Sequence, residues 1–243
     1  MSDIYTAPEA ELTETTTEGE YGSIEKALSG DYEFDIGSVL SEAWGRVKGN
    51  KLGYFLCSLV YSVICFASLV PVFILLYQTG DSAIVQILLN LAYPLVLMPI
   101  AMGFVFIGVR IALSKPYSPS SLFVFFSKAI KIFLVYLLMS ILIGIGFLLV
   151  VPGIYLAVAY SFALTLTVDK DMGVWEALET SRQAVTKRWF AIFGLLLVVY
   201  FILFLSMFTL GIALIWTMPL MGIAYGITYR NLFGVESETL ARS

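Results

Sequence analysis

The sequence predicts an all-α, polytopic membrane protein with six transmembrane helices, and three observations lead to this fold class. Hydrophobic residues make up 59% of the 243 positions and charged residues only 13%, whereas soluble domains are about 45–50% apolar. The apolar stretches are continuous rather than alternating, and most reach the roughly 20 residues of a spanning helix, which favours helices over a barrel. The basic residues all fall on one side of these stretches. The expected spans cover about residues 52–77, 84–113, 130–151, 154–168, 190–214 and 218–233.

The distribution of basic residues predicts the orientation of the chain. With six spans, all 14 Lys and Arg residues lie on the same side as the N-terminus. Asp81 is the only charged residue in the three short turns on the other side. Short loops that carry Lys and Arg stay in the cytoplasm, so we expect both termini to be cytoplasmic.

The ends of the chain are expected to lie outside the membrane domain, which covers residues 35–234. Ten acidic residues fall in the first 35 positions, with Lys26 as the only base. Such a polar, Thr-rich segment cannot bury enough apolar surface to fold. We therefore expect residues 1–34 to form a disordered acidic tail in the cytoplasm, and residues 235–243 to form a short second tail there.

Residues 174–188 predict an amphipathic helix that leads directly into the fifth span. Apolar and small residues recur at spacings of three and four, and charged residues take the opposite face. Two interpretations stay open: the helix packs on its own protein, or it lies in the lipid interface, which its continuation into a span favours. The expected apolar face consists of Val174, Ala177, Leu178, Ser181, Ala184 and Val185.

An earlier stretch, residues 35–55, matches this one at a constant offset and indicates an internal repeat. Asp35, Gly37, Arg46 and Lys51 correspond to Asp171, Gly173, Arg182 and Lys187. The spans echo each other too, because Pro99 precedes Arg110 by the same distance as Pro219 precedes Arg230. Chance similarity among apolar residues is the alternative. The repeat predicts three units of interfacial helix plus hairpin, at about residues 35–114, 115–170 and 171–234.

The candidate functional residues are those of the membrane surface and of helix contacts. Gly222 and Gly226 form a GxxxG pair that favours close helix packing. Gln86 and Asn90 form a polar pair one helical turn apart, which either lines a small polar cavity or makes hydrogen bonds between helices. Bases and tryptophans of the two amphipathic stretches are expected at the lipid interface: Trp44, Arg46, Lys48, Lys51, Trp175, Arg182, Lys187, Arg188 and Trp189.

Catalytic chemistry is not indicated by the sequence. Histidine is absent, and no phosphate-binding glycine loop, metal-ligand cluster or nucleophile–base pair stands out. Cys57 and Cys65 are about two helical turns apart, too far to bridge each other. Arg110 and Arg230 lie near the cytoplasmic ends of their spans, where we expect them to snorkel to the surface. We expect no catalytic, cofactor-binding or metal-binding residues, and no nucleic-acid surface.

One stretch also carries a resemblance. The motif Ala177-Leu178-x-x-Ser181, followed by Lys187, Trp189 and a last span led by proline, resembles a broad group of uncharacterised bacterial multi-pass inner-membrane proteins. It is similar to the membrane domain that accompanies some bacterial glycerophosphodiester phosphodiesterases. The likeness covers mainly residues 150–233. It implies a helical protein of the bacterial inner membrane, and it carries over no catalytic residue.

Two functions are compatible with these features. The first is a non-enzymatic membrane scaffold or an accessory subunit of another membrane or envelope system. The second is a transporter or channel for a lipid or a small apolar solute. The expected partners are membrane lipids with anionic headgroups, together with a protein partner or further copies of this chain.

Overall fold

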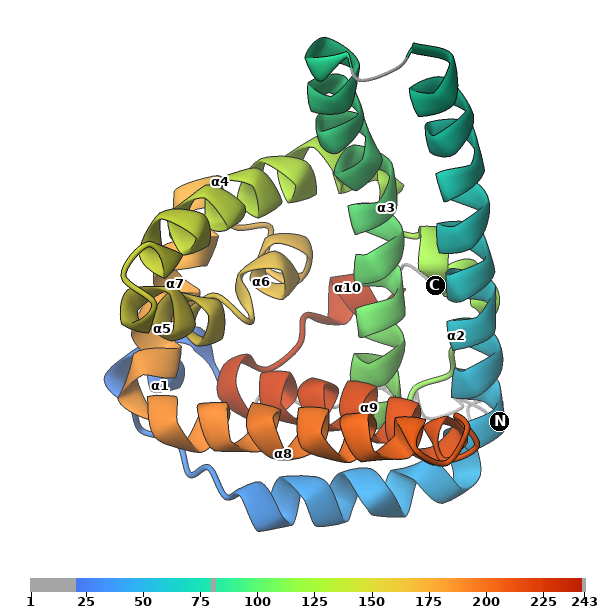
Figure 1. Cartoon of the computed structure of the whole chain (residues 1–243). Coiled ribbons are helices and arrows are strands. Elements are labelled where there is room, and N and C mark those ends of the chain that lie inside the picture. Colours follow the sequence, from blue (N-terminus) through green and yellow to red (C-terminus); the bar gives the residue numbers. More distant parts are fainter. Residues whose placement is uncertain (1–20, 80–81, 242–243) are drawn as a thin grey trace, which may run out of the picture.

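The computed structural model describes residues 21–79 and 82–241, and in this part of the chain the regular structure is helical throughout (Figure 1). Two short 3₁₀ helices, η1 and η2, join α3 to α4. The helices are α1 (Ile24–Ser29), α2 (Ile36–Thr79), α3 (Ala83–Ala112), η1 (Pro119–Phe123), η2 (Phe126–Lys128), α4 (Ala129–Phe147), α5 (Val151–Ala159), α6 (Ala163–Asp169), α7 (Val174–Lys187), α8 (Trp189–Met207), α9 (Leu214–Phe233) and α10 (Ser237–Ala241).

Five helical segments of the described chain are long and apolar enough to cross a membrane, which confirms the predicted all-helical, polytopic class. They are Ile36–Thr79, Ala83–Ala112, Pro119–Phe147, Val151–Asp169 and Trp189–Met207. The sixth expected span, at residues 218–233, is part of α9 and is not among the five. Arg230 and Asn231 reduce its apolar character, and its C-terminal half is buried in the protein.

The expected interfacial helix and the first span form one helix, α2, of 44 residues. In Figure 1 its first part crosses the base of the molecule, and the helix then changes direction and rises. The helix contains Gly45, Gly49, Gly53 and Pro71, which are residue types that favour a change of direction. The first part buries Val39, Ala43 and Val47.

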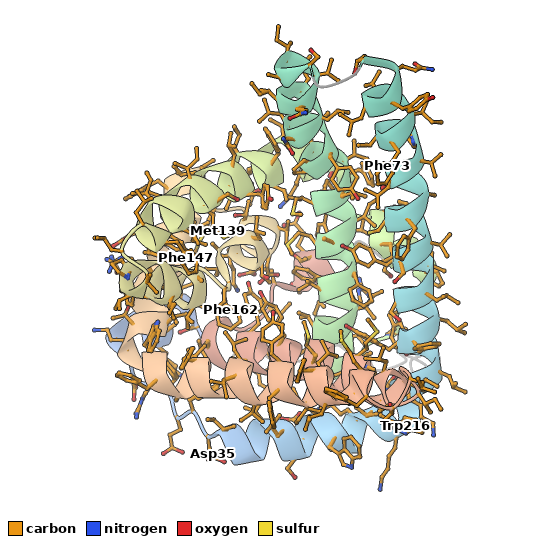
Figure 2. All side chains as sticks on the ribbon, in the orientation of Figure 1. Asp35, Phe73, Met139, Phe147, Phe162 and Trp216 are labelled. Atoms are coloured by element: carbon orange, nitrogen blue, oxygen red, sulfur yellow. The ribbon has the colours of Figure 1, made fainter. Side chains whose placement is uncertain are left out.

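Beyond the bend, α2 and α3 form a hairpin that projects from the rest of the protein (Figures 1 and 2). We call residues 59–79 and 82–96 the α2–α3 arm. The most apolar stretch of α2 has no residue that is buried inside the protein. Phe66 is 72% exposed and Phe73 67% exposed. Many large apolar side chains of the arm therefore face the surroundings of the protein, whereas Tyr61, Ile64 and Tyr93 pack against the core.

The centre of the fold is the packing of α9 against α2 and α3. Gly108 of α3 lies against the backbone of Gly222, and Gly226 lies against the backbone of Gly108. An added Cβ at Gly222 would also collide with the hydroxyl of Tyr54. The GxxxG pair therefore lies at a helix crossing within the chain, where the backbones approach too closely for any side chain.

This crossing leads to a stability prediction. The substitution Gly108→Ala should destabilise the protein by about 1–3 kcal/mol, because the Cβ meets a backbone carbonyl that cannot move aside. The melting temperature in detergent measures the effect. The control is Gly144→Ala in α4, where a Cβ meets nothing within 4 Å and alanine should be neutral or stabilising by about 0.5–1 kcal/mol. Equal melting temperatures for the two variants would contradict the close crossing.

The fourth expected span, residues 154–168, is broken into α5 and α6. Residues 160–162 leave the helix, and groups from other elements bind the freed backbone. Ser181 Oγ of α7 donates to Ala159 O at 2.7 Å and accepts from Phe162 N at 3.2 Å, and Tyr225 Oη of α9 donates to Ser161 O at 3.0 Å. The break is stable because these hydroxyls replace the missing helical hydrogen bonds.

The turns at the far ends of the second and third hairpins are apolar. Leu148 is 81% and Leu149 74% exposed between α4 and α5, and Leu210 is 95% exposed between α8 and α9. Most of their N–H groups bond within the turn, including those of Leu149 to Gly146 O and of Ile212 to Thr209 O. Pro152 and Gly153, which lie between the third and fourth expected spans, belong to the first turn of α5.

Residues 21–34, which their composition assigned to a disordered tail, belong to the folded body. Helix α1 packs on α7 and α9, with Ala27 fully buried and Tyr32 only 8% exposed. Tyr32 Oη donates to Ala184 O at 2.9 Å. Burial raises the pKa of Tyr32 to about 12, so the phenol keeps this proton at neutral pH. The expected tail at residues 1–20 lies outside the described residues.

The C-terminal segment is also part of the fold. Residues 237–241 form α10, and Thr239 is buried and donates to Asp169 O at 3.1 Å. The expected tail at residues 235–243 is therefore packed as far as residue 241, where the described part ends.

Candidate functional site

The basic and acidic residues at the helix ends form a polar layer, and its centre is the Glu42 cluster of Glu42, Arg46 and Arg230. The carboxylate of Glu42 accepts from both Nη atoms of Arg230, at 3.0 and 2.9 Å, and from Arg46 Nε at 2.9 Å. Arg46 lies one turn along α2 from Glu42, which is the favourable spacing for such a pair. Arg230 comes from the far end of the chain, so the cluster joins α2 to α9.

Both arginines of this cluster also bind the end of α3. Arg46 Nη1 donates to Ile111 O at 2.9 Å, and Arg230 Nη1 donates to Ala112 O at 2.6 Å. The last carbonyls of a helix have no partner within it, and cations favour its negative end. Two guanidinium groups therefore cap the C-terminal end of α3 and join it to the rest of the polar layer.

Arg110 and Arg230 do not snorkel as expected, because each is only 4% exposed. Arg110 donates to Leu240 O at 2.7 Å and to Pro116 O at 3.0 Å. Carbonyl groups of the loop after α3 and of α10 supply the hydrogen bonds that water would otherwise give Arg110. Both arginines fasten chain segments to each other.

A second acidic centre is Asp169, which the sequence analysis did not identify. Its side chain is fully buried. It accepts from Tyr229 Oη at 2.7 Å and from Glu236 N at 3.2 Å. Lys170 binds Glu236 at 2.7 Å beside it. These contacts join α6 to α9 and to the start of α10.

A third set of contacts joins the end of η2 and the start of α4 to the loop before α7. Lys128 and Lys131 both bind Asp171 Oδ1 at 3.0 Å. Their hydrogen bonds lower the pKa of the Asp171 carboxyl. Together with the contacts above, these ion pairs join several of the segments that carry the basic residues.

Some of the predicted interface residues are exposed, and others contact side chains of the protein. Trp44 is 49% and Trp175 60% exposed, and Lys48 is exposed. Lys51 Nζ lies 5.5 Å from the ring centre of Trp216. Arg46 belongs to the Glu42 cluster, and its side chain is 27% exposed.

In α7, Arg182 pairs with Glu179 of the same helix at 2.6 Å. The hydrogen bonds from Arg182 and Gln183 lower the pKa of Glu179 to about 2. The predicted apolar face of α7 packs inside the protein, since Ala177 and Leu178 are buried against neighbouring helices. The helix therefore packs on its own protein through this face, whereas its charged residues and Trp175 face the surroundings.

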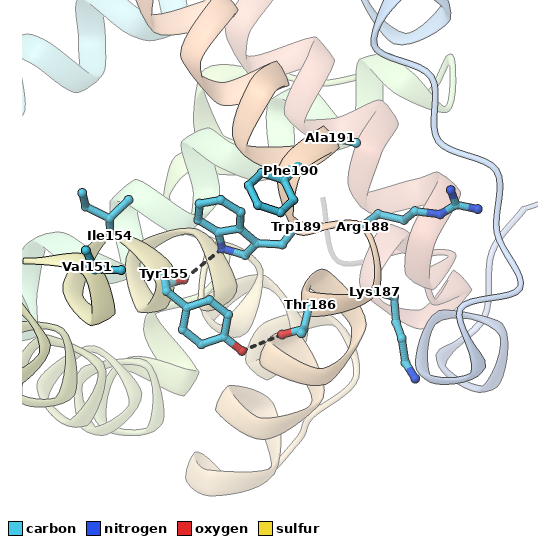
Figure 3. A pocket seen from close by; sticks show the side chains of 9 residues that line it. All are labelled: Val151, Ile154, Tyr155, Thr186, Lys187, Arg188, Trp189, Phe190 and Ala191. Atoms are coloured by element: carbon cyan, nitrogen blue, oxygen red, sulfur yellow. Dashed lines mark hydrogen bonds between the residues drawn. The ribbon is translucent and has the colours of Figure 1, made fainter.

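A hollow of about 740 Å³ lies where α5 meets the junction of α7 and α8 (Figure 3). Tyr155 Oη and Thr186 Oγ1 are 2.7 Å apart, and Trp189 Nε1 donates to Tyr155 O at 3.2 Å. The side chains of Lys187 and Arg188 point away from Tyr155. The aromatic and aliphatic wall suits an apolar chain, and these two bases do not converge on it.

Gln86 and Asn90 do not line this hollow. Nor do they line a second one of about 690 Å³, formed by α2 and the loop after α3. Both side chains are exposed on the α2–α3 arm.

Within the described residues, no group of three His, Cys, Asp or Glu side chains is placed to hold a metal ion. Cys57 is buried and Cys65 partly buried, and both are free thiols.

These features define an all-helical polytopic membrane protein whose helix ends are joined by a polar layer. Comparison of the chain with protein-family models, with curated proteins and with solved structures finds no match.

Proposed function

We propose that this protein is a non-enzymatic scaffold or accessory subunit of the bacterial inner membrane. The α2–α3 arm carries the proposal. Its apolar side chains, such as Phe66 and Phe73, face outward, while ion pairs and buried hydrogen bonds fasten the opposite helix ends together. A rigid body with a projecting apolar hairpin suits contact with the spanning helices of another protein, because such helices associate by close packing within the membrane.

The exposed bases support an orientation with the polar layer at the cytoplasmic surface. Lys48, Lys187 and Arg188 are exposed, and each base near an anionic leaflet adds about 1 kcal/mol of attraction. Trp44 and Trp175 suit the same headgroup region. The resemblance to the membrane domain found beside some glycerophosphodiester phosphodiesterases supports a bacterial inner membrane. Both termini are cytoplasmic in this proposal.

Reporter fusions test this orientation. A reporter after Gly80 should read as periplasmic, and a reporter after Lys115 as cytoplasmic, because the positive-inside rule places the basic loops in the cytoplasm. A cytoplasmic reading at both sites would reject it.

Photo-crosslinking tests the scaffold role. A benzophenone side chain at position 73, which is 67% exposed, should crosslink to a defined set of membrane proteins in intact cells. The matched control is position 223, where the isoleucine is fully buried and only crosslinks within the chain are expected. Tagged protein captured in mild detergent is identified by mass spectrometry. Crosslinks from position 73 to lipid alone would contradict a scaffold.

A transporter or channel for a lipid or small apolar solute is the second candidate, and the broken fourth span favours it. Interrupted helices with polar groups at the break often form transport sites. Within the described part of the chain, Ser161 Oγ is the one buried side-chain oxygen or nitrogen that lacks a hydrogen-bond partner. Reconstituted protein should then move fluorescent phospholipid between leaflets, and Tyr225→Phe should slow it. Movement equal to that in protein-free vesicles would exclude this activity for phospholipids.

A further inference from the structure

The α2–α3 arm carries an unusual pair of polar side chains on its exposed surface. Gln86 and Asn90 lie one turn apart on α3, and both are exposed. Between them and beside them the helix presents large apolar groups, such as Ile87 and Leu88, which are 59% and 60% exposed. Within residues 21–79 and 82–241, neither carboxamide forms a hydrogen bond to another group of the chain, whereas the backbone N–H of Gln86 donates to Ser82 O at 3.1 Å.

The backbone at Asn90 adds a further acceptor. Pro94 stands four residues later in the same helix. Proline has no N–H, so it cannot donate to the carbonyl of Asn90 as another residue would. Asn90 therefore offers two amide donors, an amide acceptor and an unsupported backbone carbonyl at one place.

The pair lies within a helix that is long and apolar enough to cross a membrane. Asn90 lies seven residues after the start of α3 at Ala83, which corresponds to about 10 Å along the helix. Hydrocarbon cannot supply hydrogen bonds, so polar groups at this depth are costly unless a protein group binds them. A partner with donors and acceptors at the same depth would satisfy both carboxamides.

We propose that this face of α3 pairs with the same face of a second copy of the chain, with Asn90 opposite Asn90 and Gln86 next to it. Two copies inserted in one orientation place each residue at the same depth as its counterpart, across a twofold axis along the membrane normal. A carboxamide is both donor and acceptor, so it is complementary to itself. Another protein would need a matching polar residue at this depth.

This contact between copies uses the same arm as the proposed scaffold function, and it rests on that function only in this respect. It involves a different surface of the arm. The pair lies on α3, whereas the crosslinking position at Phe73 lies on α2. Loss of pairing between copies can therefore be distinguished from loss of contact with other proteins.

Disulfide crosslinking in native membranes tests the contact. The chain has only two cysteines, Cys57 and Cys65, so a Cys57→Ser, Cys65→Ser background leaves no other thiol. In this background, Ile87→Cys on the paired face should give a dimer on mild oxidation. Phe66→Cys, on the outer face of α2, is the control and should give little.

The decisive variant adds Gln86→Leu and Asn90→Leu to the Ile87→Cys chain. The dimer association constant, measured by energy transfer between labelled copies in vesicles, should fall about tenfold, and Asn90→Gln should restore part of it. The melting temperature should stay unchanged, because both side chains are exposed and bind nothing within the described chain. Unchanged association in the leucine variant would overturn the proposal, and so would a disulfide from position 87 to a different protein in place of the dimer.

Discussion

Replacing Glu42 with alanine should lower the free energy of unfolding by about 2–3 kcal/mol. The substitution leaves Arg230, whose side chain is 5% exposed, without its opposite charge. Loss of one partner of a buried ion pair costs about 3–5 kcal/mol. We expect less here because the Glu42 side chain is 34% exposed and water screens part of the interaction. Thermal unfolding in detergent should show a drop in melting temperature of several degrees.

The control for this prediction is Glu179→Ala. Glu179 also holds an arginine with both carboxylate oxygens, Arg182 at 2.6 and 2.9 Å, but both side chains of that pair are about one third exposed. Exposed pairs contribute about 0–1 kcal/mol, so its melting temperature should barely change. Equal losses in the two variants would mean that burial of Arg230 does not govern the stability of the layer.

Deleting residues 21–34 together with the preceding tail should destabilise the protein by several kcal/mol, and this is the second large effect. The deletion removes the fully buried Ala27 and the nearly buried Tyr32. Burial of one large side chain alone contributes about 1.5–3 kcal/mol. It also uncovers Ala184 O, and it removes Tyr21, whose ring centre lies 4.4 Å from Arg230 Cζ.

The deletion of residues 2–20 is the matched control, since it removes none of these contacts. Melting temperature and yield in the membrane fraction compare the two truncated chains. If the longer deletion melts at the same temperature as the shorter one, the packing of α1 on α7 and α9 contributes nothing to the fold.

The elements that the sequence predicted well are those with a strong local signal. The spacing of three and four in α7 identified Ala177, Leu178, Ser181, Ala184 and Val185, and all five are buried. Long apolar runs likewise identified the spanning helices, because a bilayer sets their length and composition directly.

Elements that depend on distant partners could not be predicted in this way. No glycine or proline marks the break between α5 and α6. It depends on Ser181 and Tyr225, which are close only in the folded protein. The prediction of disorder for residues 21–34 was wrong for a related reason. The average composition of the first 34 residues is acidic, and it gives little weight to the few apolar side chains, such as Ala27 and Tyr32, that pack this segment on the rest of the protein.

The candidate site shows the same division. The sequence identified Arg46 and Arg182 as equivalent positions of a repeat, but their roles differ. Arg46 binds the end of α3, whereas Arg182 binds Glu179 in its own helix. A role of this kind depends on where another helix ends. Asp169 escaped attention because its partner Tyr229 lies 60 positions later in the sequence.

The apolar turns between α4 and α5 and between α8 and α9 have a consequence for membrane insertion in the proposed topology. When a pair of helices enters the bilayer together, its turn must cross the whole hydrocarbon layer. The turns at residues 148–150 and 208–213 contain no ionisable side chain, and most of their N–H groups are already bonded. Few polar groups lose water during the crossing, so these two hairpins can insert as preformed units. The first hairpin must translocate the carboxylate of Asp81, which makes it the one that most needs assistance from an insertion machinery.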